Sequence, residues 1–235
     1  SMSLDMENDN KVIWNVSDSI YNGVSGICLF FVELYKNVPE KKYIDAIKQS
    51  ASWLIEYVDK TPTKYYSLYS GRIGIAYCLA KIYKLTKEDV YKKKAVEIAL
   101  KSDTFFELKN LKYDLLVGPP GSIIGLLHIY DATKEEKLLA IIDMYVNKIL
   151  DQLHSSEVGV YWNRSKDYMH GLCGFSHGAS GMAFIFLELG HYFKNESFYW
   201  MAEKIFAYEN YHYNKITGNW PDYRKAIYKE GDYED

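Results

Sequence analysis

Four segments of the chain are apolar on nearly every side, and each begins at a pair of glycines with two residues between them. The pairs are Gly23 and Gly26, Gly71 and Gly74, Gly118 and Gly121, and Gly178 and Gly181. A run without a polar face is typical of a helix buried on most sides. Glycine at a helix start lets the backbone turn tightly and lets a neighbouring chain approach closely. The pattern therefore predicts four inner helices that begin at the glycine pairs.

Between these segments lie stretches with one apolar and one charged face. Residues 41–59, 88–100 and 134–153 carry apolar side chains at helical spacing. In the last stretch the apolar side is formed by Leu138, Ile141, Ile142, Tyr145 and Ile149. Such stretches are typical of helices that pack one face on a core. They are predicted to be outer helices.

The glycine pairs recur with a nearly constant period. Counted from the second glycine of each pair, the copies stand 48, 47 and 60 residues apart. A period near 48 accommodates two helices and two short connections. Alternating inner and outer helices are typical of an α/α toroid, in which the amino ends of the inner helices surround one mouth. An open stack of helical hairpins fits the same spacing, so this alternative stays open.

One insertion interrupts the period before the fourth glycine pair. Residues 157–165 alternate apolar and polar side chains and include Gly159, which predicts a short extended segment in place of a helix. We therefore expect an all-α fold over residues 1–235 as a single domain, with this one extended insertion. Ser1 and Met2 are set aside as a processing scar.

Composition and charge exclude several classes of function. The chain has 235 residues, of which 48% are hydrophobic, enough for a substantial core. Its net charge of −3 gives no electrostatic reason to bind nucleic acid. The longest apolar runs, such as residues 182–187, fall far short of the roughly 20 residues that span a bilayer, and the amino terminus has no secretory signal pattern. We expect a cytoplasmic protein without a membrane span.

The three cysteines do not form a disulfide framework, because they are scattered and never paired as Cys-x-x-Cys. Cys28 and Cys78 fall in the apolar inner segments and are predicted to be core residues. Cys173 lies between His170 and His177 in a glycine-rich loop. That spacing fixes no coordination geometry. A local zinc site and a Cys–His nucleophile pair are therefore the weaker hypotheses, and we predict no metal ligand in this chain.

The strongest candidate for chemistry is His177, in the loop before the fourth inner helix. An imidazole held at a helix start is suited to acid–base work near neutral pH. Asp114, four residues before Gly118, lies in the preceding loop and could orient that imidazole or accept a proton. Structural alternatives stay open for both residues. His177 could cap or pack at the helix start, and Asp114 could be a helix N-cap.

Several motifs together resemble a known family. The four Gly-x-x-Gly helix starts, the segment from Tyr113 to Gly121 and the run Gly174-Phe-Ser-His-Gly-Ala-Ser-Gly181 look like those of the lanthionine synthetase C-like cyclases. The likeness is greatest to the cyclase half of the bifunctional class II lanthipeptide synthetases. Tyr208-Glu209, followed by residues 218–224, is similar to a run that follows the His-Gly motif in those enzymes. The resemblance covers nearly the whole chain.

The resemblance implies an α/α toroid of about seven helical hairpins and a zinc-dependent ring closure. In the family, a cysteine thiol of a precursor peptide adds to a dehydroalanine or dehydrobutyrine to give a thioether. Zinc would lower the pKa of the thiol and present a thiolate. By motif match, Asp114 and His177 stand at the family's acid–base positions, where the histidine would manage the proton of the enolate. The implied partner is a precursor peptide.

The sequence departs from the family pattern in the zinc ligands. The family takes them from the next two glycine repeats, and this sequence contains neither repeat. With about four of seven copies, we expect a partial ring without its own zinc, incomplete or inactive in ring formation. Three explanations stay open: a truncated chain, a degenerate member that binds peptide without cyclising it, and a ring completed by a partner chain or by self-association. The acidic tail, residues 228–235, looks solvated and fits truncation best.

Three classes of function follow. The leading one is a cyclase-type domain of lanthipeptide biosynthesis, and whether this chain alone is an enzyme stays open. The rival is a non-catalytic module that binds a peptide or protein on the same scaffold. A glycan-processing enzyme of the α/α type needs a pair of carboxylates at the rim. Asp114 is the one rim acid that the motifs place, so this class ranks last.

Overall fold

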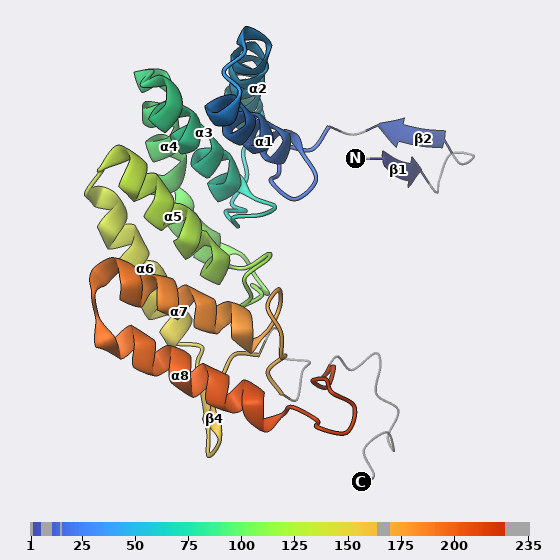
Figure 1. Cartoon of the computed structure of the whole chain (residues 1–235), viewed down its shortest axis with the longest axis vertical. Helices are drawn as coiled ribbons and strands as arrows, with labels where there is room; N and C mark the ends of the chain where they lie inside the picture. The colour runs from blue at the N-terminus through green and yellow to red at the C-terminus, as the bar shows by residue number, and fades with distance from the viewer. Residues whose placement is uncertain (1, 6–10, 15, 164–169, 224–235) are drawn as a thin grey trace. The chain divides into compact units, whose positions relative to one another are not determined.

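The computed structural model describes residues 2–5, 11–14, 16–163 and 170–223. Within these ranges the chain is mainly helical (Figure 1). The helices are α1 (Val24–Asn37), α2 (Lys41–Lys60), α3 (Arg72–Thr86), α4 (Asp89–Leu100), the 3₁₀ helix η1 (Ser102–Glu107), α5 (Pro119–Thr133), α6 (Lys137–Leu150), α7 (Ala179–Phe193) and α8 (Glu196–Tyr211). Each inner helix begins at the residue after the first glycine of a pair, as predicted.

The elements group into two compact units. One comprises residues 1–105 and 125–141, and the other residues 106–124 and 142–235, so α5 and α6 contribute to both. In the first unit α1 packs on α2, α3 packs on α4, and α1 also contacts α3. In the second unit α7 packs on α8 (Figure 1). The predicted alternation of inner and outer helices in hairpins is therefore confirmed, while the single-domain assignment stays a prediction.

The glycine pairs are explained by a loop that folds back onto the start of each inner helix. In all four copies, both glycines lie against the carbonyl oxygen of the residue six positions earlier. A Cβ atom at Gly118 would stand 1.9 Å from the Lys112 oxygen, and one at Gly178 would stand 2.3 Å from the Leu172 oxygen. A larger residue would push the loop off the helix. The motif thus marks a close backbone approach.

The same loop satisfies the amide at the start of the helix, which has no partner within the helix. The Arg72 N–H donates to the Tyr65 carbonyl at 3.1 Å, and the Ala179 N–H donates to the Leu172 carbonyl at 2.9 Å. Val24 makes the equivalent bond to Ser17. These inner helices therefore start without a side-chain cap, and the loop backbone takes that role.

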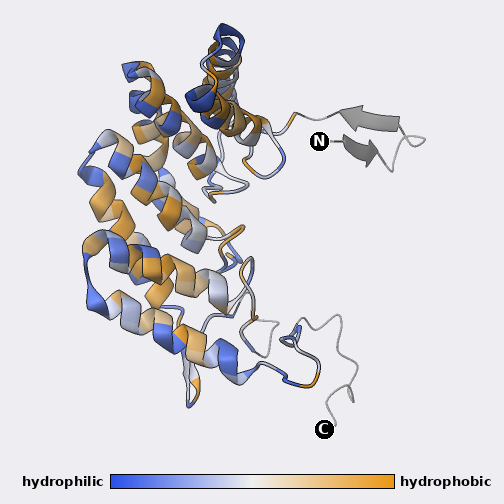
Figure 2. Ribbon diagram, viewed as in Figure 1, coloured by the Kyte–Doolittle hydropathy of each residue, from blue (hydrophilic) through white to orange (hydrophobic). Residues whose placement is uncertain are grey.

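The outer helices have the predicted two faces, whereas one inner helix does not have the predicted burial. In α2 the apolar face is fully buried at Ile47 and Leu54. Figure 2 shows hydrophobic residues along α5 and α7 and hydrophilic residues at the connection between α7 and α8. On α1, however, Ile27 and Phe30 are 58% and 62% exposed. The prediction of an inner helix buried on most sides is therefore wrong for α1, whose neighbours in its unit are α2 and α3.

Two short antiparallel hairpins accompany the helices. Strands β3 (His154–Ser156) and β4 (Gly159–Tyr161) pair with each other, and β4 packs on α8. The predicted extended segment at 157–165 therefore exists but starts earlier and turns at residues 157–158, and its last two residues lie outside the described ranges. Strands β1 (Met2–Asp5) and β2 (Lys11–Trp14) form a second pair that the sequence pattern did not indicate. Leaving Met2 out of the fold was wrong, because its backbone pairs with Trp14, while its assignment to a processing scar stays a prediction.

Three further predictions concern the core, the tail and the membrane. Cys28 and Cys78 are fully buried free thiols, which confirms them as core residues. The tail at residues 228–235 lies outside the described residues. In the part of the chain that the structure describes, no helix combines the length and apolar character needed to cross a membrane.

Candidate active site

The loops before α5 and α7 lie against each other within the second unit. The Leu116 N–H in the first loop donates to the Ser176 carbonyl in the second at 3.2 Å. A Cβ atom at Gly181 would approach the Leu115 side chain to 3.1 Å, so the two loops are closely packed at this point. Asp114 and His177, the two residues singled out from the sequence, sit one in each loop. Loop packing therefore brings together residues that are 63 positions apart in the chain.

Asp114 occupies a position that has a structural role in other copies of the loop. Ser19 and Ser67 stand at the same distance before their glycine pairs, and each hydroxyl accepts from the N–H three residues later, at 3.1 and 3.3 Å. Asp114 does the same through Oδ1, which accepts from the Val117 N–H at 2.7 Å. It therefore stabilises the turn before α5. A carboxylate has a second oxygen, which the serines lack.

The second oxygen of Asp114 holds His177. The distance from Asp114 Oδ2 to His177 Nδ1 is 2.9 Å. The Asp114 side chain is 0% exposed, whereas the His177 side chain is 32% exposed. In the neutral imidazole a carboxylate at Nδ1 selects the tautomer with the proton on that nitrogen, so Nε2 carries the lone pair. The pair thus combines a buried, fixed carboxylate with an accessible base.

Glu209 hydrogen-bonds to the loop that carries His177, and the sequence patterns did not single it out as a candidate. Glu209, in the last turn of α8, is 4% exposed. Its carboxylate accepts from the Gly174 N–H at 2.9 Å and from the Ser180 hydroxyl at 2.7 Å. Its backbone carbonyl accepts from the Trp220 indole N–H at 2.9 Å. The signal in the sequence was an acid at helical spacing from Ala202 and Ile205, on the buried face of α8.

The other candidate ligands, Cys173 and His170, lie in different surroundings from His177. Burial, together with the Glu209 carboxylate, raises the pKa of the Cys173 thiol to about 12, so the thiolate is disfavoured. His170 is exposed, and its ring contacts those of His212 and Tyr223. Among the described residues no group of three or more His, Cys, Asp or Glu side chains could hold a metal ion. The described residues of this loop therefore do not fit a zinc site.

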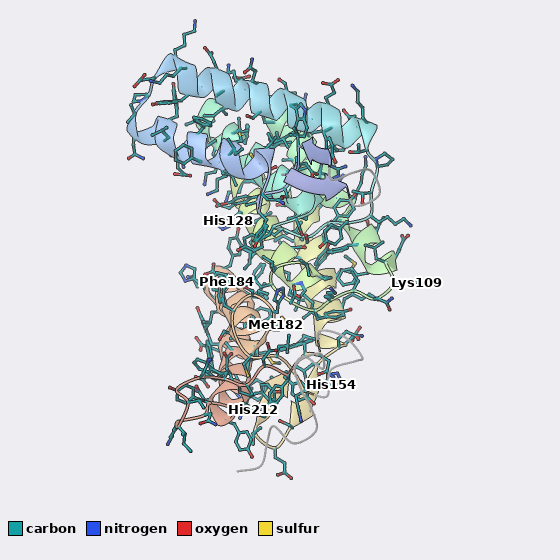
Figure 3. The ribbon with its side chains drawn as sticks, turned by 90° about the vertical axis from the view of Figure 1, so that its right-hand side faces the viewer. Lys109, His128, His154, Met182, Phe184 and His212 are labelled. Carbon is teal, nitrogen blue, oxygen red and sulfur yellow. The ribbon has the colours of Figure 1, made fainter. Side chains whose placement is uncertain are left out.

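A row of aromatic rings extends along the base of the loop. His154 stacks on Tyr161, Tyr161 stacks on Tyr208, and Tyr208 contacts His212, with centroid distances of 5.3, 4.6 and 4.6 Å. Figure 3 labels the two histidines at the ends of this row. Burial and the neighbouring His170 lower the pKa of His212, and the Tyr208 hydroxyl donates to the Gly171 carbonyl at 2.9 Å. The aromatic row therefore bonds to the loop at Gly171, before the segment that carries His177.

The fold and the site together define an α/α protein with a carboxylate–imidazole pair at the start of its inner helices. The sequence matches the family described as lanthionine synthetase C-like protein over residues 15–235. It is 24% identical to the lacticin 481/lactococcin biosynthesis protein LcnDR2 of Lactococcus lactis subsp. lactis in a match 233 positions long that covers 96% of this chain and 23% of that protein. The match to the family covers nearly the whole sequence. The chain therefore belongs to the lanthionine synthetase C-like family.

Solved structures with a similar fold agree with this assignment. Nisin cyclase matches with a TM-score of 0.64 and 17% identity, over 80% of this chain and 57% of that chain. The unsaturated glucuronyl hydrolase of Bacillus sp. GL1 matches with a TM-score of 0.50 and 15% identity, over 91% and 62% of the two chains. At such identities the likeness concerns the fold alone, and it confirms the expected all-α, toroid-type architecture. The chain spans about a quarter of the curated relative and 57% of nisin cyclase.

Proposed function

We propose that this chain is a cyclase-type domain of lanthipeptide biosynthesis in which Asp114 and His177 move a proton during thioether formation. The observation that carries the proposal is the 2.9 Å contact between His177 Nδ1 and the buried Asp114 carboxylate. A fixed carboxylate at one ring nitrogen leaves the other nitrogen as an oriented general base. The names of LcnDR2 and nisin cyclase, which concern lantibiotic biosynthesis, support a peptide substrate.

The reaction requires one proton to change place. A peptide cysteine sulfur bonds to the β carbon of a dehydroalanine, the C=C π electrons move to the α carbon and its carbonyl as an enolate, and the sulfur loses its proton. Nε2 of His177 accepts that proton and returns it to the α carbon as imidazolium, while Asp114 stabilises the positive ring. The S–H bond breaks, and S–C and C–H bonds form. The face on which Nε2 lies sets the configuration of the new stereocentre.

Zinc is the cofactor that the family implies, and the described residues do not fit it, since they form no group of three metal-ligating side chains. The proposed contribution of this chain is the acid–base pair, in which His177 is the base for the substrate thiol. General acid–base catalysis supplies about 10²–10⁴-fold in rate. Ring closure with this chain should therefore exceed the rate in buffer by about this factor.

The test uses a synthetic peptide that contains one dehydroalanine and one cysteine a few residues apart. Loss of free thiol is followed by N-ethylmaleimide labelling and mass spectrometry, and the two diastereomers of the product are separated after hydrolysis. The full chain should accelerate closure over buffer and enrich one diastereomer. His177→Asn, which keeps a donor toward Asp114, should return both the rate and the diastereomer ratio to those of buffer.

Asp114→Asn is the matched variant for the orientation of the imidazole. An amide can still accept from Val117, but its NH₂ group faces Nδ1 of His177, so the ring must carry its proton on Nε2. Nε2 then carries a proton and cannot act as the base, so the rate should fall to near that of buffer, a loss of about 10²–10⁴-fold. Equal rates and diastereomer ratios for the wild type, both variants and buffer would refute the proposal.

The rival functions give different results in the same experiment. A non-catalytic binding module would bind a fluorescently labelled form of this peptide with equal affinity in the wild type and in His177→Asn, and neither protein would change the rate of ring closure. The exposed Phe175, two residues before His177, is an apolar contact available to either function. A glycan-processing enzyme would need Asp114 to face its substrate. Because Asp114 is fully buried against His177, its position does not support that class.

A further inference from the structure

Glu209 bonds to both ends of the short loop that carries His177. One end is Gly174, whose N–H donates to Glu209 Oε1, and the other is Ser180, whose hydroxyl lies 2.7 Å from both carboxylate oxygens. His177 lies between these two residues. The carboxylate comes from α8, whereas the loop precedes and begins α7. A side chain of a separate helix therefore closes the loop at its base.

The burial of Glu209 makes this closure strong. A carboxylate taken out of water is costly unless hydrogen-bond donors replace the lost water. Among the described residues Glu209 has no ion-pair partner, and its charge is compensated by the amide of Gly174 and the hydroxyl of Ser180. Hydrogen bonds to a charged group are stronger than neutral ones. Displacing the loop would leave a buried charge without donors, so the loop is held in one position.

The hydrogen bond to Glu209 acts on the backbone at Gly174. Gly174 has a φ of +95°, a conformation that other residues rarely adopt. Its N–H is held by Glu209, and its carbonyl accepts from the Gly181 N–H at 3.5 Å. Farther along, the Ser176 carbonyl accepts from Leu116 in the Asp114 loop. The direction of the chain into His177 is thus set on one side by Glu209 and on the other by the loop of Asp114.

We propose that Glu209 is the positioning residue of the site, which holds the segment from Gly174 to Ser180 so that the His177 ring meets Asp114. Among the described residues the Glu209 carboxylate bonds to Gly174 and Ser180, and not to His177. It acts through the loop backbone, and the hydrogen bond between Nδ1 and Asp114 depends on it. This inference rests on the proposed acid–base function. The dependence of the His177–Asp114 hydrogen bond on Glu209 can nevertheless be tested without any substrate.

The substrate-free test is the proton NMR signal of the His177 Nδ1–H, identified by its absence in His177→Asn. A ring N–H bonded to a buried carboxylate exchanges slowly and resonates far downfield. Glu209→Ala should broaden or shift this signal, and Ser180→Ala, which removes one of the two loop contacts, should do so to a smaller extent. Glu209→Gln retains an oxygen for the Gly174 N–H and should preserve the signal. Ser180→Ala carries the test if Glu209→Ala fails to fold by circular dichroism.

Tyr208→Phe is the matched control. Tyr208 is the neighbour of Glu209 on α8, is also buried, and donates to the same loop at Gly171, before the segment that Glu209 closes. This variant should lose stability without changing the His177 signal. In the peptide assay, Glu209→Ala should lower the His177-dependent rate at saturating peptide by about 10- to 100-fold, with a nearly unchanged KM, because misplacement of a catalytic group acts on the chemical step.

The outcomes separate the two proposals. An unchanged His177 signal in folded Glu209→Ala and Ser180→Ala, or an equal loss of the signal in Tyr208→Phe, would overturn the positioning role. The absence of a downfield signal in the wild type would also overturn it, since there would be no bond to position. A signal that depends on Glu209 in a protein without ring closure would uphold the positioning role and refute the proposed function.

Discussion

Replacing Gly181 by alanine should destabilise the protein even though alanine is the better helix former. Gly181 lies in the first turn of α7. A Cβ atom there would stand 2.0 Å from the Phe175 carbonyl oxygen and 3.1 Å from Leu115 Cβ, whereas ordinary contacts lie at 3.4–4 Å. The closest atom belongs to the backbone and cannot rotate away. The loop before α7 must therefore move.

The size of the effect follows from two opposing terms. Alanine gains up to about 0.5–1 kcal/mol over glycine within a helix. Inserting a methyl group into a closely packed site costs about 1–3 kcal/mol, and the upper part of that range applies because a carbonyl oxygen obstructs it. The free energy of unfolding should thus fall by roughly 1–2 kcal/mol. For a chain of this length that corresponds to a decrease in Tm of about 2–8 °C.

Gly190→Ala is the matched control, because Gly190 lies on the same helix and gains the same helix propensity. Its Cβ atom would meet the Tyr199 ring at 2.9–3.0 Å, and a ring can tilt where a carbonyl cannot. Thermal unfolding followed by far-UV circular dichroism should place this variant within about 1 kcal/mol of the wild type. A Gly181→Ala protein as stable as the wild type, or as stable as Gly190→Ala, would refute the backbone-contact explanation of the motif.

Two further predictions concern titrating groups. Iodoacetamide should alkylate Cys173 slowly in the folded protein, at a rate that rises about tenfold per pH unit beyond pH 9, because the pKa of the thiol is about 12; a plateau near the ordinary thiol pKa of about 8.5 would contradict this. Lys134 and Lys84 hold the pKa of Asp131 at about 2, below its unfolded value of about 3.9. The carboxylate therefore contributes stability that is complete above about pH 4 and is lost as the pH falls through about 2. Asp131→Asn should lower the urea midpoint slightly at pH 7, since the ion pairs are exposed, and the difference should shrink below about pH 4 and vanish below about pH 2; a difference independent of pH would contradict the assignment.

The starts of the inner helices could be predicted from the sequence because the requirement is local. Each glycine lies against a carbonyl only six residues away, so the same residues must recur wherever the loop recurs. The outer helices were predictable for a similar reason, since their apolar faces repeat at helical spacing. The exposure of one face of α1 was not predictable. The composition of α1 resembles that of α3, and its burial depends on how many helices surround it.

The candidate site was only partly predictable. The motifs indicated Asp114 and His177, but not that one oxygen of Asp114 would bond the turn while the other bonded the imidazole. The alternative interpretation of Asp114 as a helix N-cap came near to the observed contact, because Oδ1 accepts from a backbone N–H. That N–H belongs to Val117, in the turn before α5, and not to the helix itself. The motifs included Glu209 only as part of the Tyr208-Glu209 stretch that resembles the family. Its contacts depend on the packing of α8 against the loop before α7.

The sequence by itself therefore determined the class of fold, the positions of the inner and outer helices and the residue types at the helix starts. These properties depend on contacts between residues close in the chain, which leave a periodic record. Tertiary structure decided which of those residues meet. The bond between Asp114 and His177 joins positions 63 residues apart, and the hold of Glu209 on Gly174 joins positions 35 apart. Both contacts form because the loop before α5, the loop before α7 and helix α8 pack against each other. A pattern among neighbouring residues cannot predict which distant residues such packing brings together.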